Sequence, residues 1–235
     1  MYKRQLEGYG LTETTAPATL NTPELIKIGT VGPPLPGVSI QIGDDGEILV
    51  KGNSVFSAYR NNENATKDAI VDGWFHTGDI GELDNDGFLR ITGRKKELLI
   101  TAGGKNVAPA VLEDRLRAHP LVSQCIVVGD KKPFIGALLT LDAEMLPSWA
   151  KNNGLQGLSM DQARTNEVVL AEIQRAVDGA NEAVSRAESI RKFTVLAGDF
   201  TEENGYLTPS LKLKRNAVMK DYALDVEALY AGPRE

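Results

Sequence analysis

The stretch that decides how this chain is organised is Gly73-Trp74-Phe75-His76-Thr77-Gly78-Asp79, followed by Gly93-Arg94-Lys95-Lys96-Glu97-Leu98. The first run places a single carboxylate, Asp79, directly after a glycine. The second is a glycine turn with three successive basic side chains, and strand-like sequence joins the two. A carboxylate that accepts hydrogen bonds from vicinal hydroxyls is how many proteins hold a ribose, although Asp79 would equally serve as an ordinary turn residue that accepts backbone N–H groups. The pattern predicts a nucleotide-binding region that ends at a basic pivot.

Composition excludes several classes of protein. The 235 residues are enough for one large domain or two modest ones. The 26 basic and 32 acidic residues give a net charge of −6, and aromatic residues make up 6%. Neither a dense basic patch nor a base-stacking surface is expected, so we predict no nucleic-acid partner. The single cysteine, Cys125, and the lack of an apolar run of about 18 residues predict a cytoplasmic protein with neither a disulfide nor a spanning helix.

The first part of the chain is rich in strand patterns. Residues 38–42 and 47–51 alternate on either side of a Gly/Asp turn, and residues 80–83 and 88–91 flank a second such turn. A short helix is expected over residues 61–69, started around Asn62. Short strands joined by Gly/Asp turns predict a distorted barrel or sheet.

The pattern changes after Gly93. A helix is expected to start at residues 106–109, and strands at 122–128 and 134–141. Further helices are expected at 143–152 and 161–189, then a strand at 190–196 and a helix at 212–222. The fold class is therefore α/β to α+β: a β-rich region over residues 1–93, a hinge over 94–97 and a small α+β domain over 98–235. Residues 1–5 match no element, and we expect them to be adapter sequence or a frayed terminus.

Two segments add candidate ligand-binding groups to the first region. In Tyr9-Gly10-Leu11-Thr12-Glu13, Thr12 can hydrogen-bond a phosphate and Glu13 can hold Mg²⁺, which prefers oxygen ligands. The alternative is a helix N-cap at Thr12. Arg94 can contact a ribose or a phosphate with its planar fork, whereas Lys95 and Lys96 would equally be solvated surface charges.

The second region contributes two further candidates. Gly103 and Gly104 allow the backbone to approach a ligand closely, although the same residues suit a plain loop. Lys212 follows Thr208-Pro209-Ser210-Leu211, where an ammonium group can stabilise negative charge that develops during a reaction. The alternative is a basic helix start.

The order and spacing of these segments resemble the adenylate-forming acyl-CoA synthetase superfamily, and most closely its bacterial long-chain fatty-acyl-CoA synthetases, from about Glu7 to Tyr222. The resemblance implies that residues 1–93 are the end of the AMP-binding domain and that the second region is a mobile lid. It implies these roles: Tyr9, Gly10, Thr12, Asp79 and Arg94 for the nucleotide, Glu13 for Mg²⁺, Lys96 for the hinge, Gly103 and Gly104 for CoA, and Lys212 for catalysis. Leu211 departs from the glycine that commonly precedes that lysine, and Lys214 is a rival for its role.

The implied reaction joins a fatty acid to ATP, which gives an acyl-adenylate and pyrophosphate, and then to CoA. Such lipid substrates are compatible with contact at a membrane surface. A Ser/Thr/Gly-rich phosphate loop is absent from the sequence, so we expect this chain to bind ATP poorly and to lack synthetase activity on its own. Two alternatives remain. One is a fatty acyl-AMP ligase, which often carries an insertion where Arg94–Pro109 has none. The other is a stand-alone binding module, which a stop codon just upstream of Glu7 would support.

Overall fold

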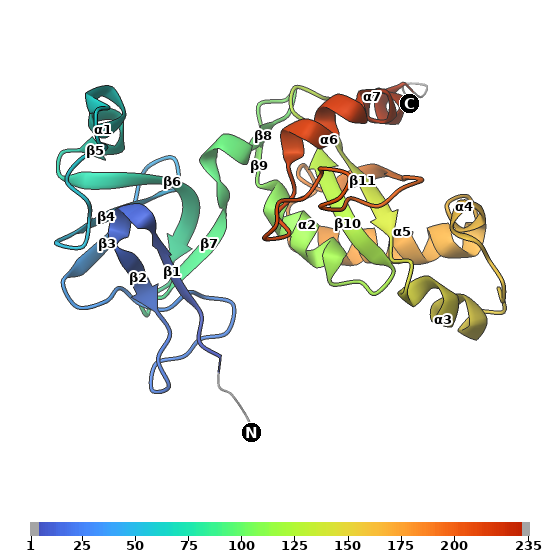
Figure 1. The fold of residues 1–235 in the computed structure, drawn as a ribbon, viewed down its shortest axis with the longest axis horizontal. Coiled ribbons are helices and arrows are strands. Elements are labelled where there is room, and N and C mark those ends of the chain that lie inside the picture. Colours follow the sequence, from blue (N-terminus) through green and yellow to red (C-terminus); the bar gives the residue numbers. More distant parts are fainter. Residues whose placement is uncertain (1–4, 232–235) are drawn as a thin grey trace. The chain divides into compact units, whose positions relative to one another are not determined.

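The computed structural model describes residues 5–231. It divides after Glu97 into two compact units, which are called unit 1 and unit 2 and are described separately (Figure 1). Of the five residues expected to be adapter sequence, the first four lie outside the described range. The chain is a mixed α/β protein in which unit 1 is mainly strands and unit 2 contains most of the helices.

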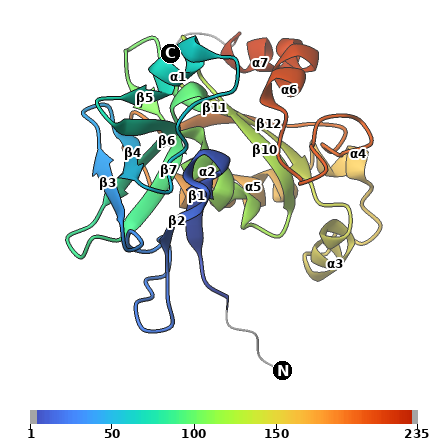
Figure 2. The same cartoon turned by 60° about the vertical axis from the view of Figure 1, so that its left-hand side comes forward.

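Unit 1 is built on a five-stranded antiparallel sheet. Its strands are β3 (Val38–Ile42), β4 (Glu47–Gly52), β5 (Ile70–Val71), β6 (Trp74–Leu83) and β7 (Leu89–Arg94). The order is β3-β4-β6, and β5 and β7 both pair with the edge of β6 that lies opposite β4. The neighbouring strands β3, β4 and β6 form a curled sheet in Figure 2, so the expected distorted barrel is an open, curled sheet.

Local sequence signals explain these elements. The predicted β3–β4 hairpin is confirmed, and Gly46 supplies the left-handed conformation its turn needs, with a φ of 82°. The predicted short helix is also confirmed as α1 (Glu63–Ala69), because the Asn62 side chain caps it by accepting the Ala65 N–H at 3.1 Å. Ile48, Val50 and Phe75 form the core beneath these elements.

A second, smaller sheet was not predicted. It pairs β1 (Gly8–Leu11) with β2 (Ala16–Leu20) around the 3₁₀ turn η1 (Thr12–Thr14). The alternative of a helix cap at Thr12 is wrong, since it is Thr14 whose hydroxyl accepts the Leu11 N–H at 2.9 Å. A Cβ at Gly10 would lie 2.3 Å from the Ala16 carbonyl oxygen, so the close approach of the two strands requires glycine there.

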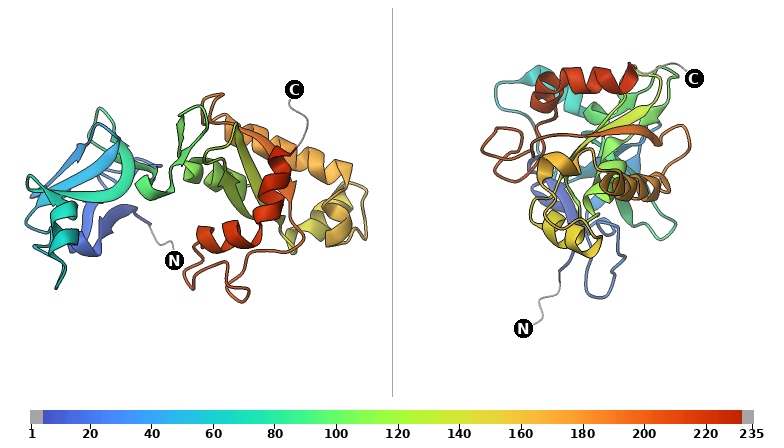
Figure 3. Two further views of the ribbon diagram at one scale, coloured as in Figure 1. Left: turned by 90° about the horizontal axis from the view of Figure 1, so that it is seen from above. Right: turned by 90° about the vertical axis from the view of Figure 1, so that its right-hand side faces the viewer.

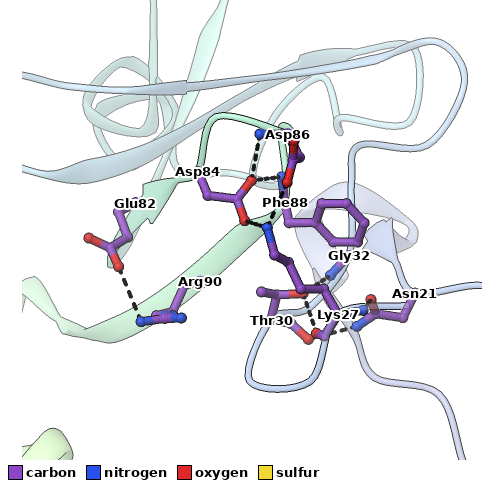
Figure 4. Close-up of polar contacts among 9 residues, drawn as sticks. All are labelled: Asn21, Lys27, Thr30, Gly32, Glu82, Asp84, Asp86, Phe88 and Arg90. Carbon is purple, nitrogen blue, oxygen red and sulfur yellow. Dashed lines mark hydrogen bonds and ion pairs between the residues drawn. The ribbon is translucent and has the colours of Figure 1, made fainter. Parts of the chain in front are cut away.

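The loop between β2 and β3 is anchored on the β6–β7 turn (Figure 4). The Lys27 ammonium lies 2.5 Å from an Asp84 oxygen and 2.9 Å from an Asp86 oxygen. It also lies 5.3 Å from the centre of the Phe88 ring. The predicted hairpin around residues 84–87 is therefore confirmed, and it supports a neighbouring loop as well.

Unit 2 has a three-stranded sheet that is covered on both faces. Its strands are β10 (Val122–Val128), β11 (Ile135–Leu141) and β12 (Ile190–Val195). Figure 3 shows helix α5 (Glu167–Asn181) on one face, with α6 (Arg215–Asp221) and α7 (Ala223–Tyr230) on the other. Alternate residues of β10 therefore enter different apolar clusters, and this explains its continuous apolar sequence.

The remaining elements of unit 2 complete the α+β module. The helix expected from residue 106 is α2 (Pro109–Arg117), with proline in its first turn, and α2 packs with α5. Helix α3 (Met145–Asn152) follows the sheet hairpin. A short ladder of β8 (Leu99–Ile100) and β9 (Asn106–Val107) precedes α2.

Two predicted helices of unit 2 have wrong bounds. The helix expected over 161–189 is two helices, α4 (Met160–Ala163) and α5, because the Asn166 side chain caps α5 by accepting the Val168 and Val169 N–H groups. The helix expected over 212–222 begins at Arg215 and is followed by α7, because the residues before it form a turn. Within residues 5–231, no helix has the length and apolar character needed to cross a membrane.

Cys125 is buried in β10. Burial raises the pKa of its thiol well above the ordinary range, and the nearby Glu113 carboxylate adds to this. A thiol that stays protonated is a poor nucleophile, so Cys125 serves as a packing residue of the core.

Candidate active site

Asp79 lies in β6 beside a cleft of about 810 Å³ in unit 1. Only 5% of the residue is exposed. One carboxylate oxygen accepts the Tyr9 hydroxyl at 2.7 Å, and the other lies 3.2 Å from Arg94 Nε. The sequence-predicted Asp79, Tyr9 and Arg94 are therefore in direct contact, although they come from three different strands.

Tyr9 acts as a neutral hydrogen-bond donor. Burial raises the pKa of its phenol above the ordinary range, and the neighbouring Asp79 charge also favours the protonated form. Gly10, the next residue of β1, brings the strand against β2. The segment is therefore positioned to present a phenol to the carboxylate.

Arg94 is the exposed member of this group, since 60% of its side chain is accessible. It lines both the cleft beside Asp79 and a second hollow of about 710 Å³ along residues 8–17. Leu11 and Glu13 also line both, so the end of β1 and the η1 turn border the two spaces. A guanidinium in this position can contact a ligand in either space.

Glu13 can serve as one ligand of a hydrated cation. Tyr59 donates its hydroxyl to one Glu13 oxygen at 2.9 Å. Burial raises the pKa of Tyr59, and its bond to Glu13 raises it further. Across residues 5–231 there is no group of three or more acidic, His or Cys side chains able to enclose a metal. A single carboxylate still fits Mg²⁺ that is held mainly by phosphates and water. Thr12, at the start of η1, is exposed.

Glu47 is the buried residue that sequence reasoning missed. It is 4% exposed and lines the same cleft as Asp79. One oxygen accepts the Gly78 N–H at 2.8 Å, and the other lies 3.0 Å from His76 Nδ1 and 2.9 Å from Lys95 Nζ. Burial would raise the pKa of Glu47, but these donors outweigh it and lower the pKa. The signal available in the sequence was a charged residue at the start of a strand whose next three residues are apolar.

The segment predicted as a hinge contains the 3₁₀ turn η2 (Lys95–Glu97). Lys95 Nζ lies 2.7 Å from Asp45 and 2.9 Å from Glu47, and these bonds raise the pKa of Lys95. Lys96 is exposed and also lines the cleft. The last residues of unit 1 are therefore anchored through Lys95.

Gly103 and Gly104 lie in the turn that joins β8 and β9 of unit 2. The Gly104 N–H donates to the Thr101 carbonyl at 2.8 Å, and Gly104 has a φ of 76°. Both glycines are exposed. The turn offers uncovered backbone, as the sequence predicted for close approach to a ligand.

Lys212 lies in the turn before α6. Its N–H donates to the Thr208 hydroxyl at 3.0 Å, and its carbonyl accepts the Thr208 N–H at 2.9 Å. Leu211 has a φ of 58°, a conformation that favours glycine. In the part of the chain that the structure describes, the Lys212 ammonium has no hydrogen bond or ion pair, so it is free for a ligand. The rival Lys214 precedes α6 as its N-cap residue.

Family models match most of the chain. The model described as AMP-binding enzyme C-terminal domain matches residues 96–234, and the model described as AMP-binding enzyme matches residues 2–60. A long-chain-fatty-acid–CoA ligase, FadD15, of Mycobacterium bovis is 58% identical over 95% of this chain and 38% of its own length. The ligase ACSBG2 of Gallus gallus is 37% identical over 96% of the chain and 33% of its own length. The chain thus spans well under half of the curated relatives it matches.

Solved structures have the same fold. O-succinylbenzoate CoA synthetase of Bacillus subtilis in complex with AMP has a TM-score of 0.62 and 31% identity, over 90% of this chain and 40% of that one. The same enzyme with ATP and magnesium ion has a TM-score of 0.64 and 31% identity, over the same shares. An anthranilate CoA ligase with anthranoyl-AMP has a TM-score of 0.70 at 22% identity, over 94% of this chain and 40% of that one, and supports the fold alone.

Proposed function

This chain belongs to the AMP-binding enzyme family, and we propose that it is part of an ATP-dependent long-chain fatty acid–CoA ligase. The whole protein would join a fatty acid to ATP, release pyrophosphate, and transfer the acyl group from the adenylate to CoA. Identity of 58% to a ligase of that class supports this choice of substrates. A cytoplasmic location, with no nucleic-acid partner, is the corresponding prediction.

The observation that carries the proposal is the carboxylate of Asp79 between Tyr9 and Arg94, at the edge of a cleft. A ribose offers two adjacent hydroxyls, and a carboxylate has lone pairs enough to accept both beside its existing donors. Tyr9 and Arg94 would hold the carboxylate in place while Arg94 also meets the nucleotide. The cleft would therefore take the ribose of ATP and of the acyl-adenylate.

The other residues would divide the remaining work. Thr12 would hydrogen-bond a phosphate, and Glu13 would hold Mg²⁺, which neutralises phosphate charge when bound. Lys212 would approach the reacting carboxylate and α-phosphate, with Lys214 as the alternative. Gly103 and Gly104 would line the path of CoA, and Lys96 would be the pivot of the domain movement between the two half-reactions.

Two other functions are less well supported. A fatty acyl-AMP ligase often carries an insertion near the junction, whereas η2, β8, β9 and α2 follow one another here over Lys95–Arg117. A stand-alone binding module would keep the nucleotide cleft without turnover. Both functions predict that the chain binds AMP in the first test below. In the second test, only the ligase predicts exchange by a longer protein that carries these residues.

The first test is nucleotide binding by the 235-residue chain. AMP should shift the amide resonances around Asp79, and 2′,3′-dideoxy-AMP should bind at least about tenfold more weakly, because it lacks the diol. Asp79→Asn should weaken AMP binding similarly, while the exposed unit 2 control Asp161→Asn should not change it. Equal affinity for both nucleotides would contradict the assignment of Asp79.

The second test is ATP–pyrophosphate exchange with a fatty acid. We expect no exchange by this chain, because its sequence contains no Ser-Gly-Thr-Thr-Gly-like phosphate loop. The longer protein that carries these residues should exchange and should release AMP when CoA is added. Exchange by the 235-residue chain itself would refute its predicted inactivity, and a longer protein that accumulates acyl-adenylate with CoA present would favour the acyl-AMP ligase.

A further inference from the structure

The buried carboxylate of Glu47 contacts Gly78 and Lys95, the chain neighbours of Asp79 and Arg94 in unit 1. We propose that Glu47 is a positioning residue that holds the Asp79 turn and the Arg94–Lys95 segment in register. The inference rests on the proposed function where it assigns a nucleotide to Asp79. The positioning role itself is argued from the contacts among three segments of unit 1 and does not depend on the bound nucleotide.

The first contact of Glu47 replaces a ladder hydrogen bond that is lost at a bulge between β4 and β6. Glu47 pairs with Ile80 and Leu49 pairs with His76, so a single residue of β4 lies opposite three residues of β6, residues 77–79. This bulge carries Asp79, and bulges often redirect a side chain beside a ligand site. It also removes the ladder partner of the Gly78 N–H. The Glu47 carboxylate takes that donor at 2.8 Å, which satisfies a partly buried N–H group that would otherwise destabilise the turn.

The Thr77 hydroxyl completes the bulge from the other side. It donates to the Ile48 carbonyl at 2.7 Å and accepts the Asp79 N–H at 3.1 Å. Gly78 has a φ of 73°, so the turn depends on glycine as well. Asp79 therefore sits on a short irregular segment whose backbone is held by two side chains, those of Glu47 and Thr77.

The second contact joins this turn to the start of the segment predicted as a hinge. Glu47 Oε2 lies 2.9 Å from Lys95 Nζ, and Lys95 directly follows Arg94, whose Nε lies 3.2 Å from Asp79. Asp79 and Arg94 are also opposite each other in the β6–β7 ladder. One carboxylate thus fixes both ends of the Asp79–Arg94 contact: the turn through Gly78 and the strand end through Lys95.

The two oxygens of Glu47 have different partners, and this makes the inference testable. Replacement by glutamine keeps an acceptor for the Gly78 N–H but loses the charge that holds Lys95. Replacement by alanine removes both. A residue that only fills space would not separate the two effects.

The experiment is residue-resolved amide hydrogen exchange on the 235-residue chain and on the variants Glu47→Ala and Glu47→Gln. In Glu47→Ala, exchange should rise at least about tenfold at Gly78 and across residues 94–97, which corresponds to about 1.4 kcal/mol of local opening. In Glu47→Gln, Gly78 should remain protected while residues 94–97 exchange faster. Ile48 and Val50 of the same sheet should change less in both variants.

A matched control exists in unit 2. Glu172 lies 3.1 Å from His119 Nε2 and 2.7 Å from Arg175 Nη2, which is the same combination of a histidine and a cation. Glu172→Gln should leave Gly78 and residues 94–97 unchanged. Unchanged exchange at Gly78 in Glu47→Ala, or an equal rise at Ile48 and Val50, would overturn the proposal, because the second result describes general stability.

AMP titration of the same samples separates this inference from the proposed function. Glu47→Ala should weaken AMP binding more than Glu47→Gln does, and Glu172→Gln should not weaken it. If AMP shifts no resonance of the wild-type chain, the nucleotide assignment fails, while the exchange pattern still decides whether Glu47 positions the Asp79 turn. If AMP binds equally to all variants, Glu47 does not position the site.

Discussion

Each unit contains a buried glutamate that holds a site-bearing segment, and the two do so differently. Glu47 of unit 1 is 4% exposed and Glu113 of unit 2 is 6% exposed. Glu113 Oε1 lies 2.6 Å from Arg215 Nη1 and accepts the Val127 N–H at 2.7 Å. Arg215 Nη2 donates to the Val127 carbonyl at 2.7 Å. The carboxylate and the guanidinium together replace the missing neighbour strand at the outer edge of β10.

The two glutamates pair with cations that differ in exposure and in geometry. The Arg215 side chain is 19% exposed, and its fork contacts both a carboxylate and a carbonyl. The Lys95 side chain is 46% exposed and shares its charge between Asp45 and Glu47. Arg215 lies three residues after Lys212, so the closed pair anchors the start of α6, whereas the half-solvated pair anchors a segment expected to rotate. The enclosed pair should therefore be the more costly one to break.

The largest effect is expected for Arg215→Met, which leaves the Glu113 carboxylate buried and without its cation. It should destabilise unit 2 by about 3 kcal/mol. Each unit has one of the two tryptophans, Trp74 and Trp149. Urea unfolding followed by Trp149 fluorescence in a Trp74→Phe background therefore measures unit 2.

The control for this change is Arg175→Met, because that side chain is 70% exposed where it pairs with Glu172. Its effect should stay below about 0.5 kcal/mol. Similar losses for Arg215→Met and Arg175→Met would show that the pair with Glu113 is not an enclosed anchor, and would remove the distinction between the two units.

Glu47→Gln measures the half-solvated pair. It should destabilise unit 1 by about 2 kcal/mol at neutral pH, since charged hydrogen bonds are lost. The folded state lowers the pKa of Glu47 from its ordinary 4.5. Its stabilising contribution is therefore complete above that value and is lost as the pH falls through the lower folded-state pKa.

The measurement is unfolding of unit 1, followed by Trp74 in a Trp149→Phe background, across an acid series. The difference in unfolding free energy between wild type and Glu47→Gln should shrink below pH 4.5. The control Glu172→Gln should leave unit 1 unaffected at every pH. A difference that stays constant through the acid range would mean that the charge of Glu47 does not stabilise unit 1.

Tyr9→Phe tests how much the hydrogen bond from Tyr9 to Asp79 contributes to the stability of unit 1. It removes the 2.7 Å hydrogen bond to a buried carboxylate oxygen and should destabilise unit 1 by about 1 kcal/mol. Tyr59→Phe is the matched control, because its hydroxyl donates to the less buried Glu13. Trp74-detected unfolding should show a smaller loss there. A larger loss for Tyr59→Phe would reverse the assigned importance of the two phenol–carboxylate pairs.

Sequence patterns predicted the elements whose signals are local. Asn62 marked the start of α1, and Pro109 marked the start of α2. The pairing of β1 with β2 was missed because residues 8–20 contain two glycines, four threonines and little alternation, so their strand character comes from pairing. The break at Asn166 was missed because an apolar helical repeat continued on its far side.

For the site, Asp79 and Arg94 were predicted from their turns and contact each other, as a ladder pair. Glu47 was missed because its role depends on the bulge of β6, which is a property of strand register. Its place at the start of an apolar strand resembled an ordinary surface charge. Register between strands far apart in sequence cannot be read from local periodicity, so Glu113 and Arg215 were missed for the same reason.

The smallest expected effect concerns the turn that carries Lys212, at the end of the segment that Arg215 anchors. Leu211 has a φ of 58° and is 70% exposed, so its side chain strains the backbone without packing. Leu211→Gly should stabilise unit 2 by roughly 0.5 kcal/mol, since relief of strain outweighs the added freedom of the unfolded chain. Leu224→Gly is the matched control: this residue is 85% exposed within α7 and should destabilise by a similar amount. Trp149-detected unfolding should therefore give opposite signs, and a loss in both variants would mean that the turn tolerates leucine without strain.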